Sequence, residues 1–182
     1  EYDSVVGDDE NGGNQVVKYL LGLGHRNIAL LTIKPELDQD NARQPHTLRR
    51  WSYERAMEEA GLKPRVIFAA QDPADAYLKA REIMAADDRP TALVAGHDAM
   101  AINALRALHD LGLSETDVAI VGYDDIDIAS HPMISLTSVR QYGNQMGKKA
   151  AEMLIERIQG ERDAANQLSI TPKLVIRSSS SK

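Results

Sequence analysis

Residues 118–125 of this 182-residue chain read Val-Ala-Ile-Val-Gly-Tyr-Asp-Asp. Four consecutive apolar residues do not suit a strand with one face in water, so both faces are expected to be covered, as in a parallel sheet flanked by helices. Gly122 permits a turn or a close backbone approach, and Asp124 and Asp125 follow the carboxyl end of the strand. Because ligands bind at that edge of open α/β sheets, the segment predicts a binding site as well as a fold.

The rest of the chain alternates between apolar runs and amphipathic helical patterns. Four central strands separated by three helices predict an α/β fold with a parallel sheet flanked by helices and right-handed crossovers. The long polar segment 34–46 predicts a loop, residues 126–141 a connection, and the serine run 178–181 a disordered tail. The pattern predicts strands at 4–7, 28–33, 65–69, 91–95, 118–123 and 173–177, and helices at 14–23, 47–60, 73–86, 98–111 and 142–159.

The sequence also predicts a second, smaller lobe. The helices at 14–23 and 142–159 lie on either side of the central unit, and they could pack together, but with one strand they make a thin core. We therefore expect one complete lobe and one incomplete lobe. The predicted division gives residues 1–24 and 140–171 to the N-terminal lobe, 25–139 and 172–177 to the C-terminal lobe, and 178–182 to a tail.

Composition excludes several classes of protein. The hydrophobic fraction of 43% and the charged fraction of 26% are typical of a globular chain. A net charge of −6 argues against a nucleic-acid surface in this chain, and the absence of cysteine removes disulfides, thiolate nucleophiles and cysteine-ligated zinc. No apolar run approaches the ~20 residues that span a bilayer, and no export signal is visible. We expect a cytoplasmic protein without membrane contact.

Polar residues follow the strands at their carboxyl ends, where topology brings them to one edge. They are Arg49 in the first turn of a helix, the pair His97 and Asp98, and the pair Asp124 and Asp125. Carboxylate, guanidinium and imidazole groups together suit a neutral, hydroxyl-rich ligand. Structural roles remain open: Asp98 could cap its helix, Asp124 and Asp125 could satisfy a turn, and Arg49 could be a solvated helix residue.

No catalytic constellation stands out: the chain has no nucleophile elbow, phosphate-binding loop or His-Glu-x-x-His motif, and no metal ligands or cofactor are predicted. A second acidic cluster, 8–10, follows the first strand. It could form a metal or phosphoacceptor pocket, but a later acidic residue and lysine at suitable spacing are not evident. We interpret it as a helix N-terminus enriched in acids, which favours the helix dipole.

Seven segments, in order through nearly the whole chain, resemble the effector-binding core of LacI/GalR-type bacterial transcription regulators. Each segment alone is weak evidence for the family, but seven segments in the same order make the resemblance specific. The segments are Asp8-Asp9-Glu10-Asn11-Gly12-Gly13, residues 23–29 (LGHRNIA), 49–53 (RRWSY), 90–101 (PTALVAGHDAMA), 121–125 (VGYDD), 132–139 (PMISLTSV) and 172–177 (PKLVIR).

The resemblance implies a two-lobed fold of the type I periplasmic-binding-protein-like kind, with an effector bound in the cleft between lobes. It implies a homodimer, and the helix at 98–111 has apolar residues on more than one stripe, as expected if sheet and partner both bury it. It implies operator binding only through a helix-turn-helix domain, which we expect to lie outside this chain. The implied ligand contacts are Arg49, Asp124, His97 and Asp98, with Asn11 and Gln141 at lobe crossings.

Two positions depart from the family pattern. His97 stands where the family usually has Asn, so the hydroxyl pattern that it reads is expected to differ, and Ser52 replaces a Gly. The chain also begins where the first lobe should already be mostly built, which agrees with the incomplete lobe.

The leading hypothesis is therefore the effector-sensing and dimerisation domain of a regulator that responds to a sugar or a related polyol or nucleoside. The alternative is a solute-binding protein of a sugar transport system. An acidic-pocket enzyme or phosphoreceiver is a third possibility, and it would bind divalent metal.

Overall fold

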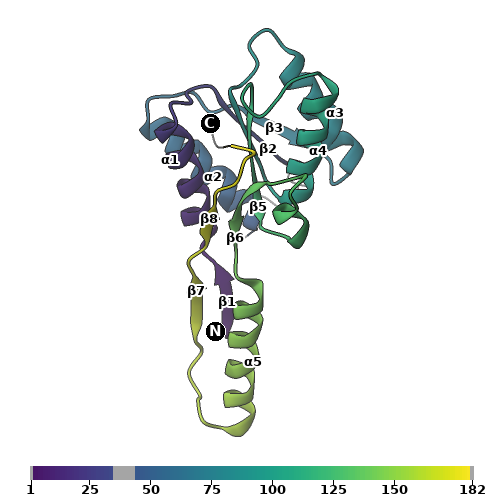
Figure 1. Ribbon diagram of the computed structural model, residues 1–182. Helices are drawn as coiled ribbons and strands as arrows, with labels where there is room; N and C mark the ends of the chain where they lie inside the picture. The colour runs from purple at the N-terminus through teal and green to yellow at the C-terminus, as the bar shows by residue number, and fades with distance from the viewer. Residues whose placement is uncertain (1, 35–43, 181–182) are drawn as a thin grey trace.

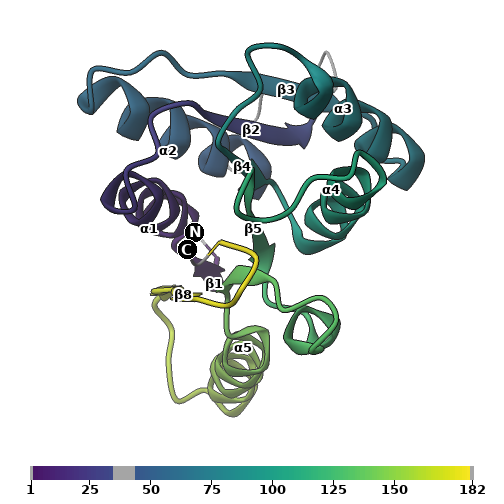
Figure 2. The ribbon, with the colours of Figure 1, turned by 45° about the horizontal axis from the view of Figure 1, so that its top comes forward.

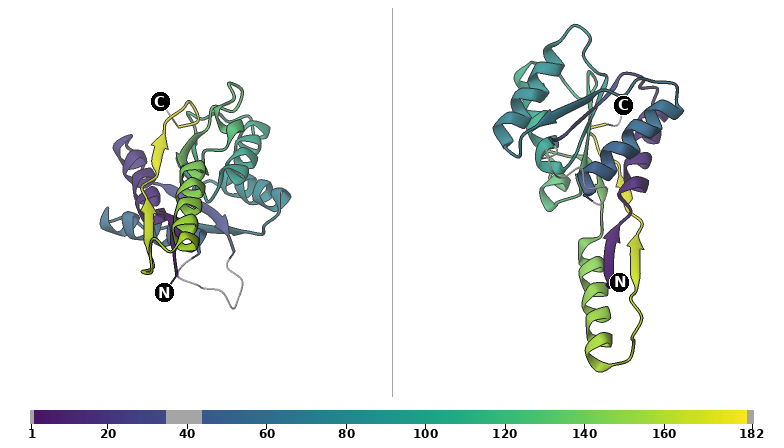
Figure 3. Two further views of the ribbon diagram at one scale, coloured as in Figure 1. Left: turned by 90° about the horizontal axis from the view of Figure 1, so that it is seen from below. Right: turned by 180° about the vertical axis from the view of Figure 1, so that it is seen from behind.

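The computed structural model describes residues 2–34 and 44–180, which form a larger and a smaller body (Figure 1). Three crossings of the chain join them: β1 (Ser4–Gly7) to α1 (Asp9–Gly22), β6 (Thr137–Arg140) to α5 (Gly143–Gln159), and β7 (Gln167–Ile170) to β8 (Lys173–Val175). Seen from behind, the smaller body projects from the larger one as a narrow extension (Figure 3). The α/β class predicted from the sequence is confirmed.

The larger body is built on one sheet, whose strand order in the described residues is β3-β2-β4-β5-β6-β8. The predicted strands are β2 (Ile28–Ile33), β3 (Val66–Ala69), β4 (Ala92–Ala95) and β5 (Ala119–Asp124), and they are parallel as expected. β6 adds a parallel strand beside β5, and β8 runs antiparallel at the edge.

Helices cover both faces of this sheet. α1 and α2 (Pro45–Glu59) lie on one face, and α3 (Pro73–Ala85) and α4 (Asp98–Asp110) lie on the other (Figure 2). The two faces bury separate apolar clusters, and neighbouring residues of β5 enter opposite ones: Ile120 packs toward α3 and α4, and Val121 toward α1 and α2. This double burial is the reason for the unbroken apolar run at the start of β5.

Helix α1 differs from the prediction in its start and its partner. It begins at Asp9 because the Asp8 carboxylate caps it, accepting a hydrogen bond from the Asn11 amide at 2.9 Å. Its buried side chains join the α2 cluster, so the expected packing of this helix against 142–159 is wrong and residues 9–22 lie in the larger body. Gly13 permits the close approach, since a Cβ there would stand 2.9 Å from the Ser52 hydroxyl.

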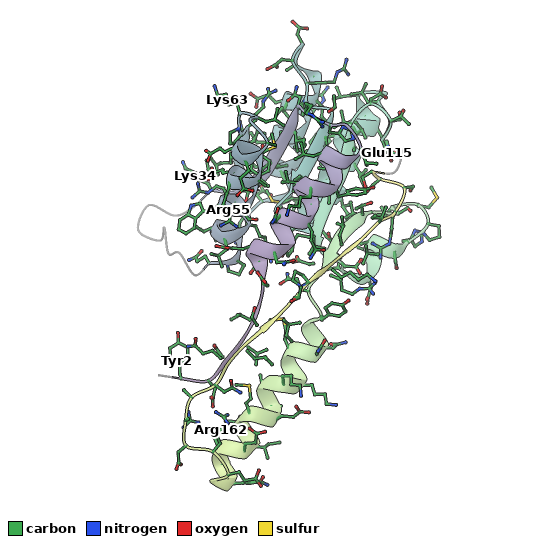
Figure 4. The ribbon with its side chains drawn as sticks, turned by 90° about the vertical axis from the view of Figure 1, so that its left-hand side faces the viewer. Tyr2, Lys34, Arg55, Lys63, Glu115 and Arg162 are labelled. Atoms are coloured by element: carbon green, nitrogen blue, oxygen red, sulfur yellow. The ribbon has the colours of Figure 1, made fainter. Side chains whose placement is uncertain are left out.

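The smaller body has little apolar core among the described residues. Met153 and Ile170 are buried, whereas Leu154, Ile155 and Ile158 are exposed. Its far end is held by ion pairs and hydrogen bonds of the Asp3 carboxylate: 2.7 Å to Arg162 Nη1, 3.0 Å to Arg157 Nε and 2.7 Å to the Asn166 amide (Figure 4 labels Arg162). The hydrogen bond from Arg162 contributes most to lowering the pKa of the Asp3 carboxyl below its ordinary value.

Two segments predicted as irregular have regular or buried structure, and one strand, β7, was not predicted at all. The connection at 126–141 contains a short 3₁₀ helix, Asp127–Ser130, and the strand β6, and β7 lies in the stretch before β8. The predicted disordered tail is wrong for Ser179 and Ser180, which are buried. Ser179 pairs with the interior strand β5: its carbonyl accepts from the Ile120 amide at 2.7 Å, and its hydroxyl donates to the Ile120 carbonyl at 2.6 Å.

Replacing Ser179 with Ala should lower the free energy of unfolding by about 1–3 kcal/mol. The Ser179 hydroxyl also accepts from the Thr137 amide at 2.8 Å, so its loss leaves two buried backbone groups unpaired. Urea denaturation measures the change, and Ser178→Ala, at an exposed neighbour, is the matched control. Equal stability of the two variants would contradict the assigned role of the tail.

The sequence also predicted a loop at 34–46 and no segment that spans a membrane. Most of the predicted loop at 34–46 falls in residues 35–43, which lie outside the described residues. Within the described part, none of the helices is both long enough and apolar enough to span a bilayer.

Candidate functional site

Three of the predicted site residues meet at the carboxyl edge of the parallel strands, beside the crossings. Arg49 extends from α2, Asp124 ends β5, and Gln141 follows β6. The Asp124 Oδ1 atom accepts a hydrogen bond from Gln141 Nε2 at 2.5 Å and lies 3.5 Å from Arg49 Nη1. Residues far apart in the sequence are thus brought together by topology, as the strand-end argument predicted.

The Arg49 guanidinium is fixed from three sides. Its Nε donates to Asp9 Oδ1 at 2.7 Å, its Nη1 donates to the Gly96 carbonyl at 2.8 Å, and its Cζ atom lies 3.7 Å from the centre of the Tyr123 ring. The residue is only 9% exposed, so it is not the solvated helix residue that the sequence left open. These contacts preorganise the donors that remain toward the edge.

Asp124 and Asp125 both have a left-handed backbone, with φ of 111° and 54°. Such conformations cost a non-glycine residue about 1–3 kcal/mol and concentrate at functional sites. Burial raises the pKa of Asp124, while Arg49 and the Gln141 hydrogen bond oppose the rise. The Asp124 side chain is about a third exposed, so one face of the carboxylate remains open to a ligand.

Asp125 has a structural role, as the sequence suggested. Its carboxylate pairs with Arg140 Nε at 2.6 Å and with Arg177 Nη2 at 2.7 Å, and its side chain is 2% exposed. It therefore ties the end of β5 to the last residue of β6 and to the segment that follows β8.

Asp98 lies behind the edge and not on it. It is 1% exposed; its Oδ1 accepts from the Ser138 hydroxyl at 2.5 Å and its Oδ2 from the Ile126 amide at 2.8 Å. Ser138 also accepts from the Asp125 amide at 3.0 Å, so Asp98 anchors the turn that carries Asp124. Asp98 is not the helix cap either, since His97 occupies that position.

The pKa of Asp98 yields a testable dependence of stability on pH. Burial raises this pKa from 3.8 to about 6, against the Ser138 and Ile126 hydrogen bonds. The native state then binds more protons than the unfolded state between these values, so rising pH through about 4 to 6 should cost roughly 1–3 kcal/mol of stability. Asp98→Asn removes this loss, as denaturation at pH 4 and pH 7 would measure.

The quantity compared is the change in the free energy of unfolding between pH 4 and pH 7. The comparison therefore holds even if Asp98→Asn is less stable than the wild type at every pH. Asp127→Asn, at an exposed position in the 3₁₀ helix, should keep the wild-type slope. A wild-type slope in Asp98→Asn would contradict the assignment.

His97 is the N-cap residue of α4. Its Nδ1 accepts from the Met100 amide at 3.3 Å, which places the proton of the neutral ring on Nε2. Burial lowers the pKa of His97; Asp124 opposes this and Arg49 reinforces it. The imidazole is therefore neutral at pH 7 and offers an N–H donor near Asp124.

Asn11 does not contact Arg49 or Asp124 in the hydrogen bonds and ion pairs of the described residues. It is exposed on α1, and its Oδ1 accepts from Gln15 Nε2 at 2.6 Å. Gln15 in turn donates to the Pro172 carbonyl and accepts from the Leu174 amide, at 3.0 and 3.1 Å. Asn11 thus adjoins the crossing into β8.

Sequence reasoning missed Asp9 and Tyr123. Asp9 was grouped with the acids at a helix start, an interpretation that suits Asp8, but it is buried and paired with Arg49. The Tyr123 hydroxyl lies so close to α1 that Gly12 has no room for a Cβ. The available signal was the position of Asp9 directly after a strand end. In residues 2–34 and 44–180, no group of His, Asp and Glu could hold a metal ion.

Comparison with known proteins gives consistent relatives. The profile of the periplasmic binding protein-like domain matches residues 17–180. The HTH-type transcriptional repressor PurR of Haemophilus influenzae (strain PittEE) is 35% identical over 176 residues, covering 93% of this chain and 51% of the relative. The chain spans about half the length of the curated relatives it matches.

Solved structures agree with the sequence relatives. A complex of the transcriptional regulator CelR with cellobiose has a TM-score of 0.84 at 31% identity, covering 98% of this chain and 54% of that one. A LacI family regulator from Enterococcus faecium with bound ribose has a TM-score of 0.85 at 25% identity, covering 97% and 64%. Relatives of this kind are transcriptional regulators and not enzymes.

Proposed function

The chain belongs to the periplasmic binding protein-like domain family, as an effector-binding domain of LacI/GalR type, and we propose that it senses a sugar or a related polyol or nucleoside. The observation that carries the proposal is the meeting of Arg49, Asp124 and Gln141 at the carboxyl edge of the sheet, beside the crossings. His97 directly follows Gly96, whose carbonyl accepts from Arg49. The relatives with bound cellobiose and ribose support this ligand class.

The chemistry of the site suits hydroxyl groups. A hydroxyl both donates and accepts, so it can donate to the open face of the Asp124 carboxylate while accepting from Arg49 or from the Nε2–H of His97. All three groups are held in place before a ligand arrives, which lowers the entropic cost of binding.

The location suggests how binding is transmitted. Asp9 directly follows the crossing out of β1, and Gln141 lies in the crossing between β6 and α5. A ligand that contacts Arg49 and Asp124 acts on the partners of Asp9 and Gln141, and so favours one arrangement of the two bodies over another. We propose that this shift alters operator binding by a helix-turn-helix domain of the full-length protein, in the cytoplasm.

A homodimer is part of the proposal. A groove runs along α4, and Met133 in it is 83% exposed. Its apolar lining residues are Ile102, Leu105, Met133 and Ile134, and its polar ones are Arg106, His109 and Asp110. A second copy would cover this face, as the resemblance implies. Sedimentation equilibrium of the full-length protein should give a dimer mass; a monomer at micromolar concentration would contradict this part.

The function is tested by adding a panel of sugars, polyols and nucleosides to the full-length protein bound to its operator. At least one neutral, hydroxyl-rich compound should bind at micromolar concentration and change the affinity for operator DNA at least fivefold, the usual size of allosteric coupling being roughly 5–150-fold. If none binds, or if binding leaves operator affinity unchanged, the proposal fails.

A further inference from the structure

The buried ion pair of Asp9 and Arg49 has a consequence for the charge of the ligand. The Arg49 Nε and Asp9 Oδ1 atoms are 2.7 Å apart, and the two side chains are 10% and 7% exposed. Arg49 also faces Asp124, whose Oδ1 lies 3.5 Å from Nη1. One guanidinium thus stands between two carboxylates before any ligand is bound.

Nearby cations in the described part of the chain do not change this balance. Arg140 and Arg177 are paired with Asp125. His97, which is neutral at pH 7 for the reasons given above, adds a donor without a charge. The groups at the edge, Arg49 with Asp9 and Asp124, therefore sum to one negative charge.

We propose that Asp9 is a specificity-determining residue: by neutralising Arg49, it makes the site select an uncharged hydroxyl-rich ligand over the phosphorylated or carboxylated analogue. The inference rests on the proposed function and goes further, because it states which member of a matched pair is rejected and which residue rejects it. Asp9 acts through Arg49, so it is a positioning residue that sets the charge of the site.

The physical reason is the difference between a hydroxyl and an oxyanion. A hydroxyl can donate to Asp124 and accept from Arg49 at the same time, whereas a phosphate dianion or a carboxylate has only acceptors to offer. The anion could not donate a hydrogen bond to the Asp124 carboxylate, so the two negative charges would repel each other. The attraction of the anion to Arg49 is already offset by the charge of Asp9. In a partly buried site, where charges are weakly screened, this repulsion is not relieved by salt.

The test uses matched pairs and calorimetry on the full-length protein: ribose and ribose 5-phosphate, glucose and glucose 6-phosphate, cellobiose and cellobionate. The wild type should bind the neutral member of a pair at least tenfold more tightly. Asp9→Asn keeps the shape and the acceptor but removes the charge, and should shift the ratio of affinities toward the anion by roughly tenfold, about 1.4 kcal/mol. Because the wild-type ratio needs no variant, the test stands even if Asp9→Asn folds poorly.

Glu10→Gln is the control, since it removes a neighbouring negative charge that pairs with Arg55 in solvent. It should leave the ratio unchanged. A wild type that binds an anionic member more tightly, or an equal shift in Asp9→Asn and Glu10→Gln, would overturn the inference while leaving the proposed function standing. If no compound of either charge binds, the proposed function fails and the inference fails with it.

Discussion

Replacing Gly122 with Ala should lower the free energy of unfolding by about 3 kcal/mol or more, because nothing around this glycine can yield. A Cβ would overlap the buried Asp98 Oδ1 and would stand 2.9 Å from Leu136 Cδ2 and 3.2 Å from Ala101 Cβ. The Asp98 carboxylate cannot retreat without losing its hydrogen bonds to Ser138 and Ile126. The glycine of the Val-Gly-Tyr-Asp-Asp segment is therefore required by a close approach and not by a turn.

Chemical denaturation of Gly122→Ala measures this loss, and Gly147→Ala is the matched control. A Cβ at Gly147, inside α5, meets nothing within 4 Å, so this substitution should leave stability unchanged or raise it by about 0.5–1 kcal/mol. A Gly122→Ala protein as stable as the wild type would show that Asp98 does not occupy this position.

Replacing Arg49 with Ala should weaken ligand affinity by roughly 100-fold, the value of one or two lost charge-assisted hydrogen bonds. It should also destabilise the fold by about 3–5 kcal/mol, because the buried Asp9 carboxylate loses its cation. Arg49→Lys should retain the charge and recover part of the stability, but not the contacts to Asp9, Gly96 and Tyr123 that the planar guanidinium makes together.

Arg50→Ala is the control for this position. Arg50 pairs with Glu54 one turn along α2, at 3.2 Å, and such pairs contribute only about 0.3–0.5 kcal/mol. Calorimetry with the best ligand from the panel should therefore give near wild-type affinity for Arg50→Ala. An Arg49→Ala protein that is folded, by circular dichroism, and binds as tightly as Arg50→Ala would contradict the site.

The sequence was sufficient for the parts of the fold that obey simple periodicity. The apolar run of β5 predicted burial on both faces, and Ile120 and Val121 enter opposite clusters as that argument requires. The same reasoning placed β2 and predicted that the residues beyond the carboxyl ends of β2 and β5, among them Arg49 and Asp124, lie close together. Parallel topology converts local patterns into long-range contacts, which explains why these predictions succeeded.

β6 could not be predicted in this way because two of its three buried residues, Thr137 and Ser138, are polar, and Val139 alone makes no apolar pattern. Thr137 and Ser138 are fully buried, and their hydroxyl groups bind the C-terminal segment and Asp98. A strand whose partners are serines of a distant tail carries no apolar pattern, and the tail carries no sign of burial. β6 and the tail were each predicted to be irregular because neither segment shows in its own sequence that it pairs with the other.

Asp9 was missed for a different reason. An acid in the first turn of a helix is explained well enough by the helix dipole, and nothing local separates Asp8, which does cap α1, from Asp9, which turns inward to Arg49. The placement of α1 was wrong on the same ground. Its apolar face fits any helix partner, and α2 is identified by contacts that the periodicity does not reveal, such as those of Gly13 with Ser52 and of Asp9 with Arg49.

We propose that Asp124, in its left-handed conformation at the end of β5, accepts hydrogen bonds from the ligand's hydroxyl groups. The most direct test is the dissociation constant of the best ligand, measured by calorimetry for wild-type, Asp124→Ala and Asp127→Ala full-length proteins. We expect a loss of affinity of roughly 100-fold for Asp124→Ala, which removes charge-assisted contacts at a partly buried carboxylate, and no change for the exposed Asp127→Ala. Wild-type affinity in Asp124→Ala would contradict it.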